Sequence, residues 1–222
     1  MQETGLFIEM VLWIISQVIV AIITILLFYK YFKSKKEGLD ARFELGLAVF
    51  FAINLIIYIY NIFCSFFITC DPIFAEIVLI VTLISLIEMV FTIEHVILTK
   101  DRYIITILYL INFATILIIG ISTGKGFLVP PMSDLNLALI YFLPLVYFYL
   151  AYKTEGVVRK RSTLFGIGFL LTLSGGTFRY QVIEQLFPTL VQSNPDFYHA
   201  FPVVVMLAGL CMILYTSLKY FK

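Results

Sequence analysis

Long apolar stretches alternate with short polar connections along the whole chain. Seven of these stretches have about 18–27 residues, and an apolar helix of about 20 residues crosses the hydrocarbon core of a bilayer. The pattern therefore predicts an all-α polytopic membrane protein, a bundle of seven transmembrane helices that forms a single domain over residues 1–222. The predicted spans cover residues 6–32, 43–67, 72–98, 103–121, 135–152, 163–186 and 200–220.

The composition shows that lipid must solvate much of this chain. Its 222 residues are 62% hydrophobic and 13% charged, whereas soluble domains are about 45–50% apolar and about 25% charged. One core of this size cannot hide so much apolar surface. We therefore expect an integral protein of the plasma membrane, with the lipid bilayer as a partner. A net charge of +1 excludes a global field that would attract nucleic acid.

The positions of the cations predict how the spans are oriented. Thirteen of the 15 Lys and Arg residues lie after the first, third and fifth spans or at the end of the chain. Lys and Arg near span ends are retained on the cytoplasmic side. The N-terminus is therefore expected outside and the C-terminus in the cytoplasm. The two exceptions are Lys125, in the loop after the fourth span, and Arg179, inside the sixth.

Polar residues inside spans are costly, so their grouping is informative. Spacings of three and four residues place polar side chains on one face of the second span and on one face of the sixth. Both faces rise from the midplane toward the outside and predict a water-accessible pocket for a small molecule. The alternative is hydrogen bonding that only holds the two spans together. The predicted pocket residues are Tyr58, Asn61, Glu76, Gln181, Glu184 and His199.

The third span carries a polar face that runs from the midplane to the inner surface. Its four residues are Ser85, Glu88, Thr92 and His95. The adjacent Glu94, like His95, is interpreted as a residue of the membrane–water interface. Glu88 is different, because it lies about 5 Å from the midpoint of its span. A lone carboxylate at that depth is neutral or paired.

Arg179 is the expected partner of Glu88, because it is the one cation inside a span and away from the span's ends. Side chains lean toward the N-terminus of their helix, and the third and sixth spans run in opposite directions. The two side chains therefore lean toward each other and are predicted to form a buried pair. Two alternatives stay open: Glu76 as the partner of Arg179, and a protonated Glu88 that donates a hydrogen bond to Asn112.

Cysteines and glycines add two local expectations. Three cysteines are too few for a disulfide scaffold. Cys64 and Cys70 are close enough in sequence to pair, but two free thiols at a lipid boundary are the favoured interpretation. Glycines at positions 166, 168, 175 and 176 of the sixth span favour close approach of another helix. The pair at 175 and 176 is also compatible with a broken helix, as in transporters.

Several established chemistries lack the residues that they require. A retinal protein needs a lysine in the middle of the last span, but Lys219 lies at its end, so no cofactor is expected. A zinc site needs at least three converging ligands, whereas His95 and His199 are expected near opposite membrane faces. A hydrolase built on Ser174 and His199 lacks a G-x-S-G context. The chain is therefore not expected to be an enzyme.

The chain resembles the seven-span sensor modules that precede histidine kinases in prokaryotes. The resemblance lies in the number of spans, the compact loops and the basic segment between the fifth and sixth spans. Size and orientation also resemble the microbial rhodopsins. The resemblance implies a sensor or receptor-like protein, with an outward-facing polar pocket and cytoplasmic basic loops that contact a signalling protein. The alternatives are a small-solute or ion transporter or channel, in which the outer and inner polar faces join, and an accessory subunit of a membrane complex.

Overall fold

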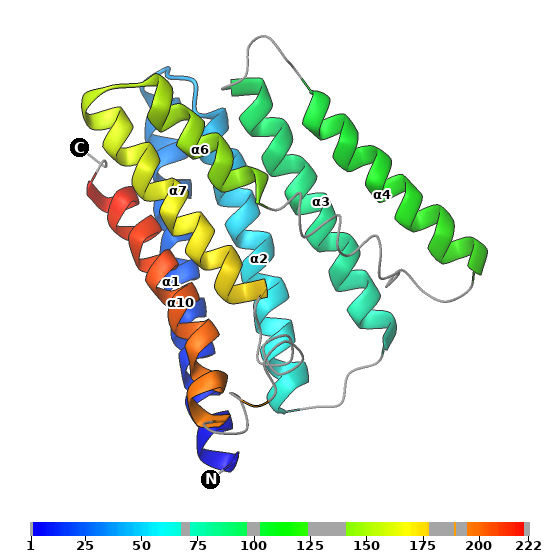
Figure 1. Cartoon of the computed structure of the whole chain (residues 1–222). Helices are drawn as coiled ribbons and strands as arrows, with labels where there is room; N and C mark the ends of the chain where they lie inside the picture. Colours follow the sequence, from blue (N-terminus) through cyan, green and yellow to red (C-terminus); the bar gives the residue numbers. More distant parts are fainter. Residues whose placement is uncertain are drawn as a thin grey trace. The chain divides into compact units, whose positions relative to one another are not determined.

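The computed structural model describes residues 2–67, 72–96, 103–123, 141–177, 189 and 195–219. Within these residues the chain is all-α and forms seven helices, which confirms the all-α part of the predicted fold class (Figure 1). The helices are α1 (Gln2–Lys36), α2 (Arg42–Phe66), α3 (Pro72–Val96), α4 (Ile104–Thr123), α6 (Phe142–Lys153), α7 (Gly156–Thr177) and α10 (Pro195–Lys219).

Several helices continue beyond the apolar stretches that predicted them. α7 begins at Gly156, before the predicted span at 163–186, and α10 begins at Pro195, before the span at 200–220. Hydropathy marks only the apolar part of a helix, while backbone hydrogen bonding continues into the polar flank. Pro195 suits the first helical position, where no N–H donor is needed. The predicted span residues 97–98, 135–140, 178–186 and 220 lie outside the described residues.

Three of the described helices are long and apolar enough to cross a membrane. They contain the segments Leu6–Lys36, Arg42–Cys64 and Phe197–Lys219, and Ile104–Ile118 is a shorter apolar helix. Their surfaces carry exposed aliphatic side chains such as Ile25 and Ile56, which are 67% and 69% exposed. These features indicate a membrane protein. The other four spans stay predictions.

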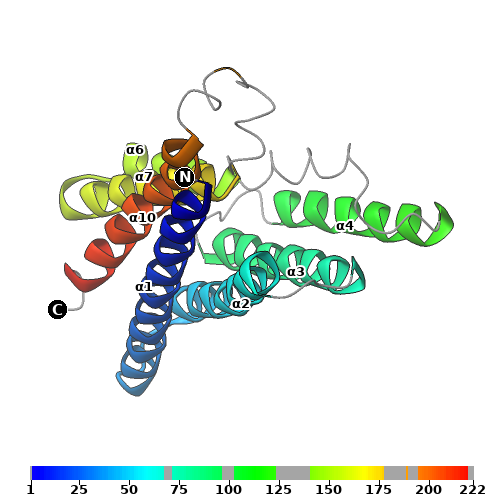
Figure 2. The ribbon, with the colours of Figure 1, turned by 90° about the horizontal axis from the view of Figure 1, so that it is seen from below.

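Contacts divide the chain into two compact units. The first contains Met1–Ile22 and Tyr141–Lys222, and the second contains Ile23–Ile140. In the first unit α7 packs against both α6 and α10. In the second unit α3 packs against both α2 and α4, and both views show α3 between them (Figures 1 and 2). The prediction of a single domain is not tested by this division.

The first unit depends on glycines that let α7 and α10 approach closely. A Cβ atom built on Gly209 of α10 would lie 2.5 Å from the carbonyl oxygen of Gly168 and from the amide nitrogen of Thr172. A Cβ atom on Gly175 would meet the carbonyl oxygen of Pro202. Gly166 instead faces the ring of Phe148 on α6. Close approach, which the glycine pattern predicted, is thus confirmed at Gly166, Gly168 and Gly175.

In the second unit, neighbouring helices run antiparallel. Moving along α3 toward its C-terminus, successive contacts move along α2 toward its N-terminus: Ser85 meets Asn54, Thr92 meets Gly46, and His95 meets Arg42. The end of α3 then contacts the start of α4. The second unit therefore gathers the start of α2, the end of α3 and the start of α4 at one end.

Candidate functional site

The polar face predicted on α3 exists, and we call it the α3 stripe (Ser85, Glu88, Thr92 and His95). Much of it is packed against α2. Asn54 Nδ2 donates hydrogen bonds to Ser85 Oγ at 3.4 Å and to the Phe50 carbonyl oxygen at 2.8 Å. Further along, Thr92 packs so closely on Gly46 that a Cβ atom there would lie 2.6 Å from Thr92 Oγ1. Ser85 and Thr92 are both buried. At these two contacts the stripe is a close-packed interface.

Glu88 is the member of the stripe with the least satisfied side chain. Its Oε1 accepts a hydrogen bond from Thr92 Oγ1 at 3.3 Å. Its Oε2 is buried and has no hydrogen-bond partner among the described residues. The proposed partner Arg179 lies outside the described residues, as does the side chain of Glu76. The Glu88–Arg179 pair therefore stays a prediction, and so do its two alternatives.

His95 connects α3 to both neighbouring helices. Its Nε2 lies 2.9 Å from Arg42 Nη1 at the start of α2, and its Nδ1 lies 2.8 Å from Tyr103 Oη just before α4. A guanidinium group only donates hydrogen bonds, so Arg42 Nη1 is the donor and His95 Nε2 the acceptor. In the tautomer in which Nε2 accepts, His95 Nδ1 carries the hydrogen and donates a hydrogen bond to the Tyr103 hydroxyl oxygen. We call Arg42, His95 and Tyr103 the inner cluster.

Tyr103 holds an unusual backbone conformation within the inner cluster. Its φ angle is +71°, which bulky side chains rarely adopt. Its ring stacks on Phe91 with centroids 5.3 Å apart, and its hydroxyl is bonded to His95. These contacts offset the cost of the strained backbone. Such strain persists only where surrounding structure enforces it, and it is concentrated at functional sites.

Glu94, which the sequence placed at the membrane–water interface, is completely buried within the protein, and its depth in a membrane stays a prediction. Its Oε1 accepts a hydrogen bond from Ile105 N at 2.7 Å, and its Oε2 accepts one from Thr106 N at 2.9 Å and another from Thr106 Oγ1. It therefore caps the first turn of α4, where amide groups lack partners within the helix. A single acidic residue in an earlier helix carries no sequence signal of this role.

The predicted outer pocket is described only in part. His199 Nδ1 lies 2.9 Å from Glu9 Oε2, and their side chains are 14% and 21% exposed. This contact joins the beginnings of α10 and α1. Tyr58 and Asn61 are half-buried on α2. Three pocket side chains lie outside the described residues: Glu76, Gln181 and Glu184. The pocket as a whole stays a prediction.

The cysteines differ from the favoured interpretation of free thiols. Cys64, near the end of α2, is disulfide-bonded, whereas Cys211 on α10 is free and exposed. The one other cysteine of the sequence is Cys70, which lies outside the described residues. The short sequence separation favours closure, because the entropy cost of joining two chain positions rises with the length of the loop between them.

A functional assignment has to rest on this geometry. No protein-family model, curated protein or solved structure matches the chain. Among the described residues, no three His, Cys, Asp or Glu side chains are grouped as a metal ion would require. Three described groups of polar residues are candidates for a functional role: the α3 stripe, the inner cluster and the contact between Glu9 and His199.

Proposed function

We propose that the chain is a seven-span plasma-membrane protein with a sensor or receptor-like function. Its N-terminus lies outside and its C-terminus in the cytoplasm. A small molecule binds the outer polar pocket, the α3 stripe carries the resulting change inward, and the cytoplasmic basic loops contact a signalling protein. The observation that carries this proposal is the α3 stripe, which is packed against α2 and ends in the hydrogen-bonded inner cluster.

Two independent features support the proposed orientation. The start of α2 carries Arg42, and Lys30 of α1 forms a 2.8 Å ion pair with Glu44 nearby; cations at span ends favour the cytoplasm. The other end of α2 carries the disulfide-bonded Cys64. Disulfides persist in oxidising environments and are rare in the cytosol. Charge and redox chemistry therefore both favour an outside location for the end of α2 that carries Cys64.

The packing of the stripe favours transmission over conduction. Thr92 packs against Gly46 so closely that a Cβ atom built on Gly46 would lie 2.6 Å from Thr92 Oγ1. Hydrogen bonds in a low-dielectric interior are strong and have discrete partners. A shift of α3 along α2 would exchange such partners. It would also change the hydrogen bonds of His95 to Arg42 and to Tyr103. Energetic coupling between distant sites needs elements of this kind.

One observation favours the transporter alternative. Glu88 has a buried carboxylate oxygen without a partner among the described residues, and carboxylates inside spans often mark ion paths. The two functions are separated in vesicles that contain the purified protein and a trapped pH-sensitive dye. The sensor proposal predicts proton flux no faster than in protein-free vesicles. Proton flux through the unmodified protein that disappears in the Glu88→Gln variant would overturn the sensor proposal and indicate a transporter.

Transmission along the stripe is tested by coupling between its two ends. Ser85→Ala and Tyr103→Phe are made singly and together, and the free energy of unfolding is measured for each. Distant independent sites add within about 0.5 kcal/mol, so a larger departure supports transmission. Ser85→Ala combined with Ser162→Ala, a buried hydroxyl in the other unit, should be additive. Additivity in both pairs would contradict transmission through α3.

A further inference from the structure

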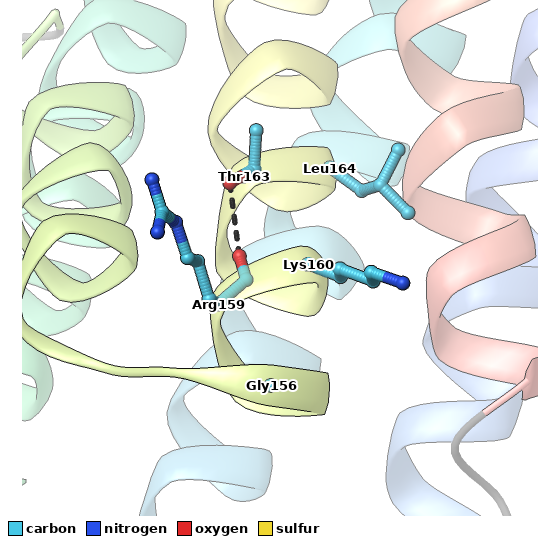
Figure 3. Close-up of a pocket in the computed structure, with 5 residues that line it drawn as sticks. All are labelled: Gly156, Arg159, Lys160, Thr163 and Leu164. Atoms are coloured by element: carbon cyan, nitrogen blue, oxygen red, sulfur yellow. Dashed lines mark hydrogen bonds between the residues drawn. The ribbon is translucent and has the colours of Figure 1, made fainter.

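A cavity of about 600 Å³ lies at the start of α7 (Figure 3). Its lining residues are Gly156, Arg159, Lys160, Thr163 and Leu164. The space beside Gly156 is open, since a Cβ atom built there would meet nothing within 4 Å. The φ angle of Gly156 is +63°, which side-chain-bearing residues rarely adopt. The backbone at this edge of the cavity therefore favours glycine.

The cavity carries two cations that no described carboxylate neutralises. Arg159 and Lys160 are exposed, and they leave α7 in different directions, so that a positive charge stands on each flank (Figure 3). The two neighbouring cations are engaged by aromatic rings. Lys153 lies 5.7 Å from the Tyr152 ring centroid, and Arg161 lies 5.9 Å from that of Phe165. Arg159 and Lys160 are thus the cations available to an anion.

The remaining lining residues define which anion fits. Thr163 Oγ1 donates its hydrogen to the Arg159 carbonyl oxygen at 2.9 Å, so the hydroxyl offers only acceptor capacity to a ligand. Leu164 adds an apolar wall. The predicted sixth span begins at residue 163, so the cations lie on its headgroup side and Leu164 on its hydrocarbon side. A ligand with an anionic head and an apolar body matches this arrangement.

We propose that this cavity binds the phosphate headgroup of an anionic phospholipid of the cytoplasmic leaflet. The proposal rests on the orientation proposed above, but not on sensing. The positive charges of Arg159 and Lys160, one on each flank of the cavity, attract the phosphate, and the glycerol and acyl part lies along Leu164. Because α7 packs against α6 and α10, a bound lipid anchors the cytoplasmic end of this three-helix group to the leaflet.

The test measures lipid binding to the full chain in neutral detergent. The probe is phosphatidylglycerol with a fluorescent acyl chain, and phosphatidylcholine with the same label is the comparison lipid. The variant Arg159→Gln/Lys160→Gln should bind phosphatidylglycerol roughly 25-fold more weakly, since each cation near an anionic headgroup contributes about fivefold. Arg159→Lys/Lys160→Arg keeps both charges and should retain binding.

Matched controls distinguish a site from general electrostatic attraction. Lys33→Gln/Lys36→Gln removes two exposed cations from the end of α1 and should leave the affinity unchanged. An equal loss in this control, or equal affinity for phosphatidylcholine, would overturn the proposal. If inorganic phosphate displaces the lipid at equal concentration, the lipid proposal is overturned and the cavity is a site for a soluble anion. Binding in detergent does not depend on signalling, so either proposal can fail alone.

Discussion

At the scale of single residues, one buried carboxylate determines how α4 begins. The first amide groups of a helix have no partners inside it, and their partial positive charge favours an anion. Glu94 supplies both oxygens to this end of α4, through Ile105 and Thr106. The same contact joins the end of α3 to the start of α4. This contact therefore holds the end of α3, where His95 also lies, against the start of α4.

Glu94→Gln should lower the stability of the protein. The amide keeps the shape of the side chain but turns one acceptor oxygen into a donor that faces other donors. An unsatisfied buried hydrogen-bonding group costs about 1–3 kcal/mol, and the loss is measured as thermal unfolding in detergent. Glu37→Gln removes an exposed carboxylate and should change little. Equal unfolding temperatures for the two variants would contradict the capping role.

The cysteines permit a count of reactive thiols. Cys64 is disulfide-bonded and Cys211 is free, and the sequence contains three cysteines. In denatured, unreduced protein we expect a thiol reagent to modify Cys211 alone, and to modify all three cysteines after reduction. The Cys211→Ser variant should react only after reduction. Three reactive thiols without reductant would show that the bridge is absent.

The sequence predicted which residues share the face of α3, but not what they contact. Helical periodicity places Ser85 and His95 on one face whatever surrounds the helix. Their partners depend on which helix lies next to α3 and on the register between the two. Apart from its charge, nothing in the sequence around Arg42 indicated that it contacts His95. Tyr103 carried none either, because its contact with His95 requires the chain to reverse direction between α3 and α4.

At the scale of helices, backbone contact between α7 and α10 defines the first unit. Helix interfaces in membranes favour small residues, because dispersion forces act only when the backbones come close. The glycines of α7 formed a recognisable group in the sequence. Gly209 of α10 did not, since a single glycine gives no pattern, yet it lies directly against Gly168 and Thr172. The sequence thus indicated one side of the interface and missed the other.

Gly209→Ala should destabilise this interface by more than Gly166→Ala. Both changes add a methyl group and gain helix propensity. At position 209 the methyl group meets backbone atoms of α7, whereas at position 166 it meets the side chain of Phe148, which can move. Overpacking costs about 1–3 kcal/mol, measured as thermal unfolding in detergent. A larger loss for Gly166→Ala would contradict the proposed close contact.

At the scale of the whole molecule, apolar length predicted more of the described structure than the polar pattern did. Each of the seven described helices overlaps one of the seven apolar stretches, as expected because a segment in lipid must satisfy its backbone hydrogen bonds internally. α7 and α10 begin before the spans predicted within them, since charged and polar residues continue a helix without marking it as apolar. The outer pocket depends on how separate helices meet, which periodicity within one helix does not determine.

Labelling of single cysteines tests the topology of the whole chain. In a Cys211→Ser background, Lys36→Cys and Lys153→Cys are exposed positions at the ends of α1 and α6. Both should react with a membrane-impermeant maleimide only after sealed cells are permeabilised, because cation-rich ends remain in the cytoplasm. Lys125→Cys should react in intact cells. Without reductant, the disulfide-bonded Cys64 contributes no background signal. Labelling of position 36 in intact cells, with position 125 protected, would invert the proposed orientation and move the inner cluster to the outer face.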